Sequence, residues 1–166
     1  MSDRATLYER VGGYNAIHKF AEDILTRLMI DDEIGQFWAH RSQHRILEEH
    51  QNFVDWLCAY WGGPKAYKGR DLATVHRGMG ITDRHWDILF EKIDQCFDDA
   101  VVPTDLRVEI TDFLKKFKPV VVGSPSLREM IKAGNPVGFT AGMEAMGVKW
   151  PSGRVLSSMP PEGSGT

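Results

Sequence analysis

Two histidines lie within otherwise apolar helical patterns, and they are the residues best suited to do chemistry. His76 follows Leu72 and Val75 at helical spacing, and His50 comes one turn before Val54. An imidazole buried without a partner costs free energy. One such histidine is usually a hydrogen-bonded core residue, but two on facing helices predict a shared ligand that takes nitrogen donors. Haem is the leading candidate.

His76 has the local sequence of a proximal haem ligand. Asp71 is a good N-cap, so we expect a short helix that carries His76. The main-chain carbonyl of Leu72 or Ala73 would then accept from one ring N–H, which orients the imidazole and leaves its other nitrogen for iron. Glycines at 78 and 80 would end that helix beside a flat cofactor.

The other side of a haem pocket needs a polar donor for a bound ligand. His50 and Gln51 are consecutive polar residues on a helix whose other inward-facing residues are apolar. Either side chain can donate a hydrogen bond. The helical wheel places Gln51 further inward than His50. For His50 three roles stay open: a pocket-rim residue, a distal donor, or a sixth iron ligand. Phe37 and Trp38 would flank the ring and exclude water.

The elements that must position these residues are predicted to be helices from about residue 5 to about 120. Apolar residues recur at helical spacing in four stretches. Breakers separate these stretches at Gly12-Gly13, Gly62-Gly63-Pro64 and Pro103-Thr104. Only Val120-Val121-Val122 has a strand-like composition. The sequence therefore predicts an all-α fold.

Composition excludes several classes of function. A chain of 166 residues with a net charge of −3 lacks the basic excess of a nucleic-acid-binding protein. No apolar run is long enough to span a bilayer, and the first residues do not form a signal peptide. Cys58 and Cys96 fall at core spacings and are expected to be free thiols in a reducing cytoplasm. We therefore expect a cytoplasmic protein without nucleic-acid or membrane partners.

A change in composition divides the chain at about residue 123. Residues 1–123 are predicted to form the domain, and residues 124–166 a glycine- and proline-rich C-terminal extension. Five of the eight prolines lie in this extension. We expect one short helix over 126–132 and mostly flexible chain after it.

An ordered set of motifs resembles the truncated haemoglobins, most closely group I. It begins at Leu7-Tyr8-Glu9-Arg10-Val11-Gly12-Gly13, continues through Phe37-Trp38, His50-Gln51 and Gly62-Gly63-Pro64, and ends with His76, Gly78-Met79-Gly80 and His85-Trp86-Asp87. The resemblance implies a globin-like two-over-two helical sandwich around haem b, with His76 as the iron ligand. The residues expected to contact haem are Phe37, Trp38, Leu47, His50, Gln51, Leu72, Val75, His76, Trp86, Leu89 and Phe90.

Three positions depart from the pattern of that family. Leu25 falls where a ligand-binding tyrosine is frequent, Leu47 where a glutamine or histidine is common, and Leu89 where other groups carry tryptophan. Polar stabilisation would therefore fall on Gln51, with His50 as the second candidate. We expect an apolar distal pocket and fast ligand dissociation.

Three functions are compatible with these residues. The first is a haem protein that reversibly binds dioxygen, carbon monoxide, nitric oxide or cyanide, for oxygen transport, storage or sensing. The second is an enzyme on the same scaffold, a nitric oxide dioxygenase or a peroxidase-like enzyme. It would need a partner reductase, because the chain has no nucleotide-binding motif. The third is a haem-free helical module, which the two inward histidines argue against.

Overall fold

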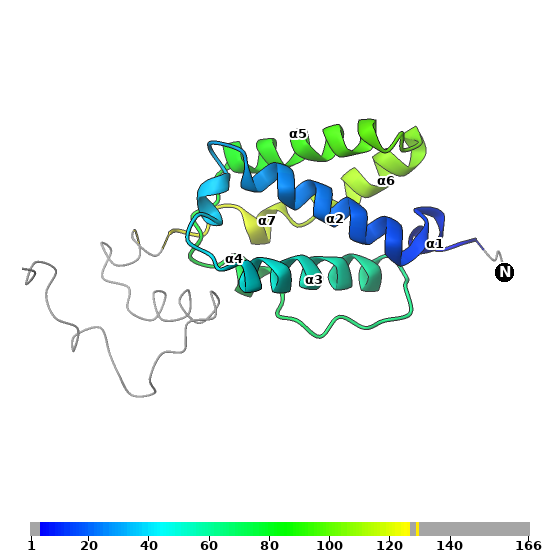
Figure 1. Cartoon of the computed structure of the whole chain (residues 1–166), viewed down its shortest axis with the longest axis horizontal. Coiled ribbons are helices and arrows are strands. Elements are labelled where there is room, and N and C mark those ends of the chain that lie inside the picture. The colour runs from blue at the N-terminus through cyan, green and yellow to red at the C-terminus, as the bar shows by residue number, and fades with distance from the viewer. Residues whose placement is uncertain (1–3, 127–128, 130–166) are drawn as a thin grey trace, which may run out of the picture. The chain divides into compact units, whose positions relative to one another are not determined.

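Helices make up all the regular structure in the described part of the chain. The computed structural model describes residues 4–126 and residue 129. Figure 1 shows the elements in chain order. They are α1 (Leu7–Arg10), α2 (Gly13–Met29), the 3-10 helix η1 (Gly35–Phe37), α3 (Gln43–Tyr60), α4 (Leu72–His76), α5 (Asp83–Asp99), α6 (Thr104–Lys115) and α7 (Lys118–Val121). The predicted all-α class is confirmed.

The described chain forms two compact units. The first contains the residues up to 70 together with residues 83–116, and it holds α1, α2, η1, α3, α5 and α6. The second contains residues 71–82 and the described residues from 117 onward, and it holds α4 and α7. Each unit is therefore built from two pieces of chain that are distant in sequence.

Helix α2 is the centre of the first unit and packs against both α3 and α5 (Figure 1). Its buried residues Ile17, Ala21, Ile24 and Leu28 recur at three and four positions, so they form one face. Between α2 and α5, the rings of Phe20 and Phe97 stack with their centroids 5.6 Å apart. The fully buried side chains of the three helices are thus packed around α2.

The N-terminal helix is fixed at both ends by specific hydrogen bonds. Thr6 and Glu9 form a reciprocal capping box at the start of α1. Gly12 and Gly13 follow with φ values of 107° and 76°, a backbone conformation that side chains other than glycine rarely adopt. Arg10 donates two hydrogen bonds, of 2.7 and 2.6 Å, to the carboxylate of Glu109 on α6. Helix α1 is thereby held against α6 within the first unit.

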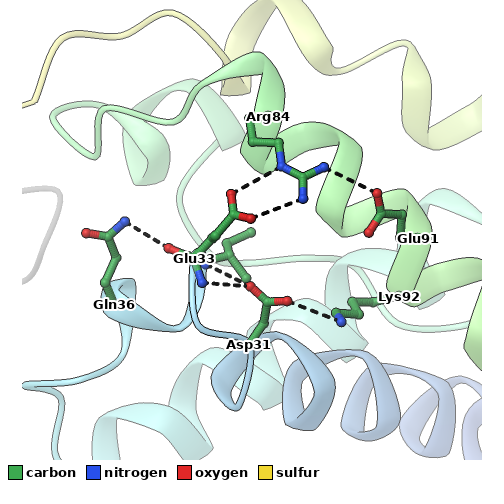
Figure 2. Close-up of polar contacts among 7 residues, drawn as sticks. Asp31, Glu33, Gln36, Arg84, Glu91 and Lys92 are labelled. Atoms are coloured by element: carbon green, nitrogen blue, oxygen red, sulfur yellow. Dashed lines mark hydrogen bonds and ion pairs between the residues drawn. The ribbon is translucent and has the colours of Figure 1, made fainter.

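A network of charged side chains holds the turn after α2 against the start of α5 (Figure 2). Arg84 donates to both carboxylate oxygens of Glu33 at 3.1 Å and pairs with Glu91 at 3.4 Å. Asp31 accepts from the main-chain N–H groups of Glu33 and Ile34, and it pairs with Lys92 at 3.2 Å. Because η1 follows this turn directly, the network fixes the approach to Phe37 and Trp38.

The fold confirms some of the expectations from the sequence and corrects others. Cys58 and Cys96 are buried free thiols, as predicted, and burial raises the pKa of both. The valine run at 120–122 was the one strand-like segment, but α7 covers it as far as Val121. Trp56 is 5 % exposed, although the apolar stripe that the sequence predicts for this helix does not include it. That stripe consists of Leu47, His50, Gln51, Val54, Leu57, Cys58 and Trp61. Of the extension, the structure describes residues 124–126 and 129, and Ser126 and Glu129 form hydrogen bonds typical of a helix start. The remainder of the expected helix over 126–132 and of the extension lies outside the described residues.

Within the described residues, no helix is both long enough and apolar enough to cross a membrane.

Candidate functional site

His76 is the last residue of α4, and its ring is held by the helix that carries it. Asp71 caps this helix: one carboxylate oxygen accepts from the main-chain N–H of Thr74 at 2.9 Å and the other from the Thr74 hydroxyl at 2.7 Å. The His76 Nδ1 lies 2.8 Å from the main-chain carbonyl oxygen of Leu72. A carbonyl only accepts, so Nδ1 carries the proton and Nε2 keeps a free lone pair.

The environment of His76 favours the neutral imidazole. Burial lowers the pKa of His76 below its ordinary value, and the hydrogen bond to the Leu72 carbonyl opposes this only in part. A neutral ring with one N–H held by a main-chain carbonyl is the form in which histidine binds metals. The side chain is therefore prepared to give Nε2 to a metal ion.

The loop after α4 is anchored within the second unit. Helix α4 packs against α7. The Gly78 N–H donates to the hydroxyl of Ser124 at 3.1 Å, and the Gly123 N–H donates to the carbonyl of Ile81 at 3.0 Å. Gly80 has a φ of 68°, and a Cβ there would lie 2.9 Å from the Cβ of Ser126. These contacts fix the point at which the chain leaves His76.

In the first unit, Phe37 and Trp38 form an aromatic corner at the end of η1. The rings of Phe37 and Trp38 lie edge to face with centroids 6.5 Å apart, and Phe37 also contacts the ring of His85 at 5.0 Å. The Trp38 Nε1 donates to a carboxylate oxygen of Glu49 on α3 at 3.2 Å, and Arg41 pairs with the same carboxylate. The corner is therefore joined to the middle of α3 through Glu49.

The polar atoms of Gln51 and His50 have partners on α2 and α3. The Gln51 amide donates to the Tyr14 hydroxyl at 3.2 Å and to Asp55 at 2.9 Å, and its side chain is exposed. His50 is half-buried, and its ring lies against that of His18. The expectation that Gln51 lies further inward than His50 was wrong. Tyr14 and Asp55 hold the amide on the outer side of α3.

The other predicted contact residues vary in exposure. Leu47 is 58 % exposed, so it belongs to the surface of α3 in the described structure. Trp86 is buried, whereas half-buried side chains are found at Leu72, Val75, Leu89 and Phe90. Leu72 and Val75 share α4 with His76 in the second unit, and the remaining predicted residues belong to the first.

The donor set of the second unit fits haem. The porphyrin supplies four nitrogens itself, so one neutral imidazole from the protein is enough to hold the iron. The described residues contain no group of three or more His, Cys, Asp and Glu side chains that could hold an ion by themselves. His76, with its tautomer set by Leu72, matches the requirement for a single axial nitrogen.

Sequence reasoning missed His18, Tyr14 and Glu49, which contact the predicted distal residues. Tyr14 and His18 are four positions apart on α2, so their spacing places them on one helix face. That spacing was the available signal. Which residues of α3 they meet depends on how the two helices pack, and the spacing along α2 does not determine that packing.

Comparisons with known proteins agree on one family. The model of the family described as "Bacterial-like globin" matches residues 6–122. A group 1 truncated hemoglobin from Mycolicibacterium paratuberculosis is 26% identical over 120 residues, which are 72% of this chain and 86% of that protein. One from Tetrahymena thermophila is 26% identical over 93 residues, 56% of this chain and 74% of that protein.

Solved structures show the same fold. The ferric form of a truncated hemoglobin from Tetrahymena pyriformis superposes with a TM-score of 0.65, at 22% identity over 72% of this chain and 99% of that one. A 2/2 hemoglobin from Synechococcus, solved in the cyanomet state with covalently attached heme, gives a TM-score of 0.59 at 24% identity, over 65% of this chain and 89% of that one.

Proposed function

The chain belongs to the bacterial-like globin family, and from this premise we propose that it holds haem b through His76 and reversibly binds dioxygen and related diatomic gases. The observation that carries the proposal is the state of His76. Its Nδ1–H is bonded to the Leu72 carbonyl at 2.8 Å, and its pKa is lowered by burial. When bound, haem would supply an iron that His76 holds and that can bind a diatomic ligand such as dioxygen, carbon monoxide, nitric oxide or cyanide.

The second unit orients the proximal imidazole. The Asp71 cap fixes the first turn of α4, and the Leu72 carbonyl fixes the rotation of the His76 ring. Such partners of a ligating histidine determine both its tautomer and its basicity. A ring held in advance loses little side-chain freedom on binding, which supports retention of the cofactor.

The residues proposed to surround a bound gas are Phe37, Trp38, His50 and Gln51. We expect Phe37 and Trp38 to exclude water, and Gln51 and His50 are the candidate donors to the gas. In the described structure Gln51 already donates to Tyr14 and Asp55, and the Nε2 of His50 to a main-chain carbonyl. A distal role for either residue requires its side chain to exchange these partners for the bound gas. We therefore expect weak polar stabilisation and fast oxygen release.

The first experiment is the absorption spectrum of the purified full chain as ferric, as dithionite-reduced, and as reduced plus carbon monoxide. A Soret band that shifts with carbon monoxide to the position of histidine-ligated haem is the expected result. No Soret band after hemin is added would overturn the proposal. If a reductase sustained nitric oxide consumption beyond one equivalent per haem, the enzymatic function would replace gas transport or sensing.

Replacement of the proximal residue tests the assignment more directly. His76→Gly should lose stable haem incorporation, and added imidazole should restore a histidine-like spectrum, because it occupies the space of the deleted ring. His44→Gly is the matched control: its side chain is 84% exposed on α3, so haem content should stay normal. Normal haem content and an unchanged spectrum in His76→Gly without imidazole would refute the role of His76.

The distal donors can be separated by stopped flow. Gln51→Leu should raise the oxygen dissociation rate if Gln51 donates to the bound gas, whereas His50→Leu should leave that rate unchanged. A raised rate only in His50→Leu would assign the role to His50. Two unchanged rates would mean that neither side chain stabilises the gas.

A further inference from the structure

The rings of His18 and His50 meet where α2 and α3 pack together in the first unit. Their centroids are 4.5 Å apart, and their planes are inclined at 79°. Both side chains are half-buried, so solvent reaches them. We propose that this pair binds a divalent transition-metal ion, with copper(II) bound most tightly.

The separation of the rings fits two imidazoles bound to one ion. With a metal–nitrogen bond of about 2.0 Å, each ring centroid lies about 3.2 Å from the metal. Two rings at a right angle around that metal are then about 4.5 Å apart, and two at the tetrahedral angle about 5.2 Å. The rings of His18 and His50 meet edge to face at 4.5 Å, so they already lie at a separation that two neighbouring ligands in the tetragonal coordination of copper(II) can adopt.

A hydrogen bond prepares His50 as a ligand. Its Nε2 lies 3.3 Å from the main-chain carbonyl oxygen of His18. The carbonyl only accepts, so Nε2 carries the proton and the lone pair is left on Nδ1. Metal-binding histidines usually donate their second ring N–H in this way. The main chain of one member of the pair thus sets the tautomer of the other.

The surroundings determine which class of ion the pair takes. The Tyr14 ring lies 6.0 Å from that of His18, and the nearby Gln51 amide is neutral. Because the described residues contain no cluster of three or more His, Cys, Asp and Glu ligands, water would complete the coordination. Two imidazoles and water suit copper, nickel and zinc, whereas calcium and magnesium prefer carboxylate oxygens. Among the divalent ions, copper(II) has the highest affinity for such nitrogen ligands.

The proposal excludes another role for His50. If His50 were the sixth ligand of a haem iron, its ring would leave His18, and no pair would remain. The ferric spectrum therefore tests the inference independently: a low-spin spectrum that His50→Gln abolishes would overturn it.

The main test is calorimetric titration of copper(II) into the haem-loaded ferric full chain. The wild type should bind one ion tightly, and His18→Gln should weaken binding about 100-fold, because the second ligand of a pair acts at high effective concentration. His44→Gln is the control, since His44 is an exposed histidine that pairs with Glu48 one turn away. Equal affinities of His18→Gln and His44→Gln, or no stoichiometric binding by the wild type, would refute the site.

A second measurement needs no variant. Diethyl pyrocarbonate modifies accessible imidazoles, and peptide mapping identifies the modified residues. One equivalent of copper(II) should protect His18 and His50 together and leave His44 reactive. Protection of neither member, or of only one, would overturn the inference even if His18→Gln failed to fold.

Discussion

Val101 is the residue whose replacement tests the local energetics of the fold most directly. It follows α5 with a φ of 51°, the only positive φ of a non-glycine residue among those described. Its N–H bonds to the carbonyl of Asp98 at 3.1 Å, and the Val102 N–H bonds to that of Phe97 at 3.0 Å. These two bonds form a Schellman motif, in which the position of Val101 is usually glycine.

The effect of Val101→Gly can be estimated from three contributions. A left-handed conformation costs a non-glycine residue about 1–2 kcal/mol, and a β-branched side chain such as valine falls at the upper end. Glycine costs about 0.5–1 kcal/mol through the greater freedom of the unfolded chain. The side chain is 81% exposed, so its removal gives up little burial. We expect a net stabilisation of about 1 kcal/mol, or about 2–4 °C in Tm.

Urea unfolding with matched variants measures this value. Val108→Gly is the control, because Val108 is also exposed, at 55%, but lies inside α6. There the same substitution should destabilise by about 0.5–1 kcal/mol, since glycine is a poor helix former. Opposite signs at the two positions, with an unchanged dependence on urea, are the expected result. A loss of stability in Val101→Gly similar to that in Val108→Gly would refute the strain argument.

Three further outcomes follow from the ionisable groups. Arg84 lowers the pKa of Glu33, so this pair stabilises the fold above the ordinary glutamate pKa and loses its effect as the pH falls through the lowered pKa. Arg84→Gln should therefore raise the pH of acid unfolding, and its difference from wild type should disappear once Glu33 is protonated in both proteins. Because burial lowers the pKa of His76, haem affinity should stay constant to below pH 6.5 and then fall about tenfold per pH unit. Transfer of haem to an apoglobin measures this affinity. A loss of haem affinity that begins above pH 6.5 would contradict the prediction. Cys58 and Cys96 are buried with raised thiol pKa values, so a disulfide reagent should titrate two thiols in urea and none in the native protein.

The sequence predicted the parts of the fold that depend on neighbouring residues. The cap at Asp71 and the bond from His76 to Leu72 both lie within one helical turn, so spacing alone was enough to expect them. The face of α2 was predicted for the same reason. Trp56 was missed because it lies off the regular stripe, and its burial depends on neighbours such as Phe113, 5.5 Å away on α6.

The distal side of the candidate site depends on packing between helices, and here prediction was weaker. A helical wheel ranks Gln51 as inward, but it contains no information about Tyr14, which comes from another helix and binds the amide on the outer side of α3. The pairing of His18 with His50 likewise joins residues 32 positions apart. Which side chains meet across a helix crossing depends on how the two helices pack, and a single sequence does not give that packing.

The division of the chain into two interleaved units has a consequence for synthesis on the ribosome. Helix α4 carries His76, but the residues that anchor its loop, Gly123 and Ser124, are about 48 positions further along the chain. At a translation rate of about 5–20 residues per second, these partners are made roughly 2–10 seconds after the histidine. During this interval the growing chain already contains its candidate haem ligand but not the residues that hold the ligand's loop in place. Cofactor capture by the nascent protein would therefore wait until translation has passed Ser124.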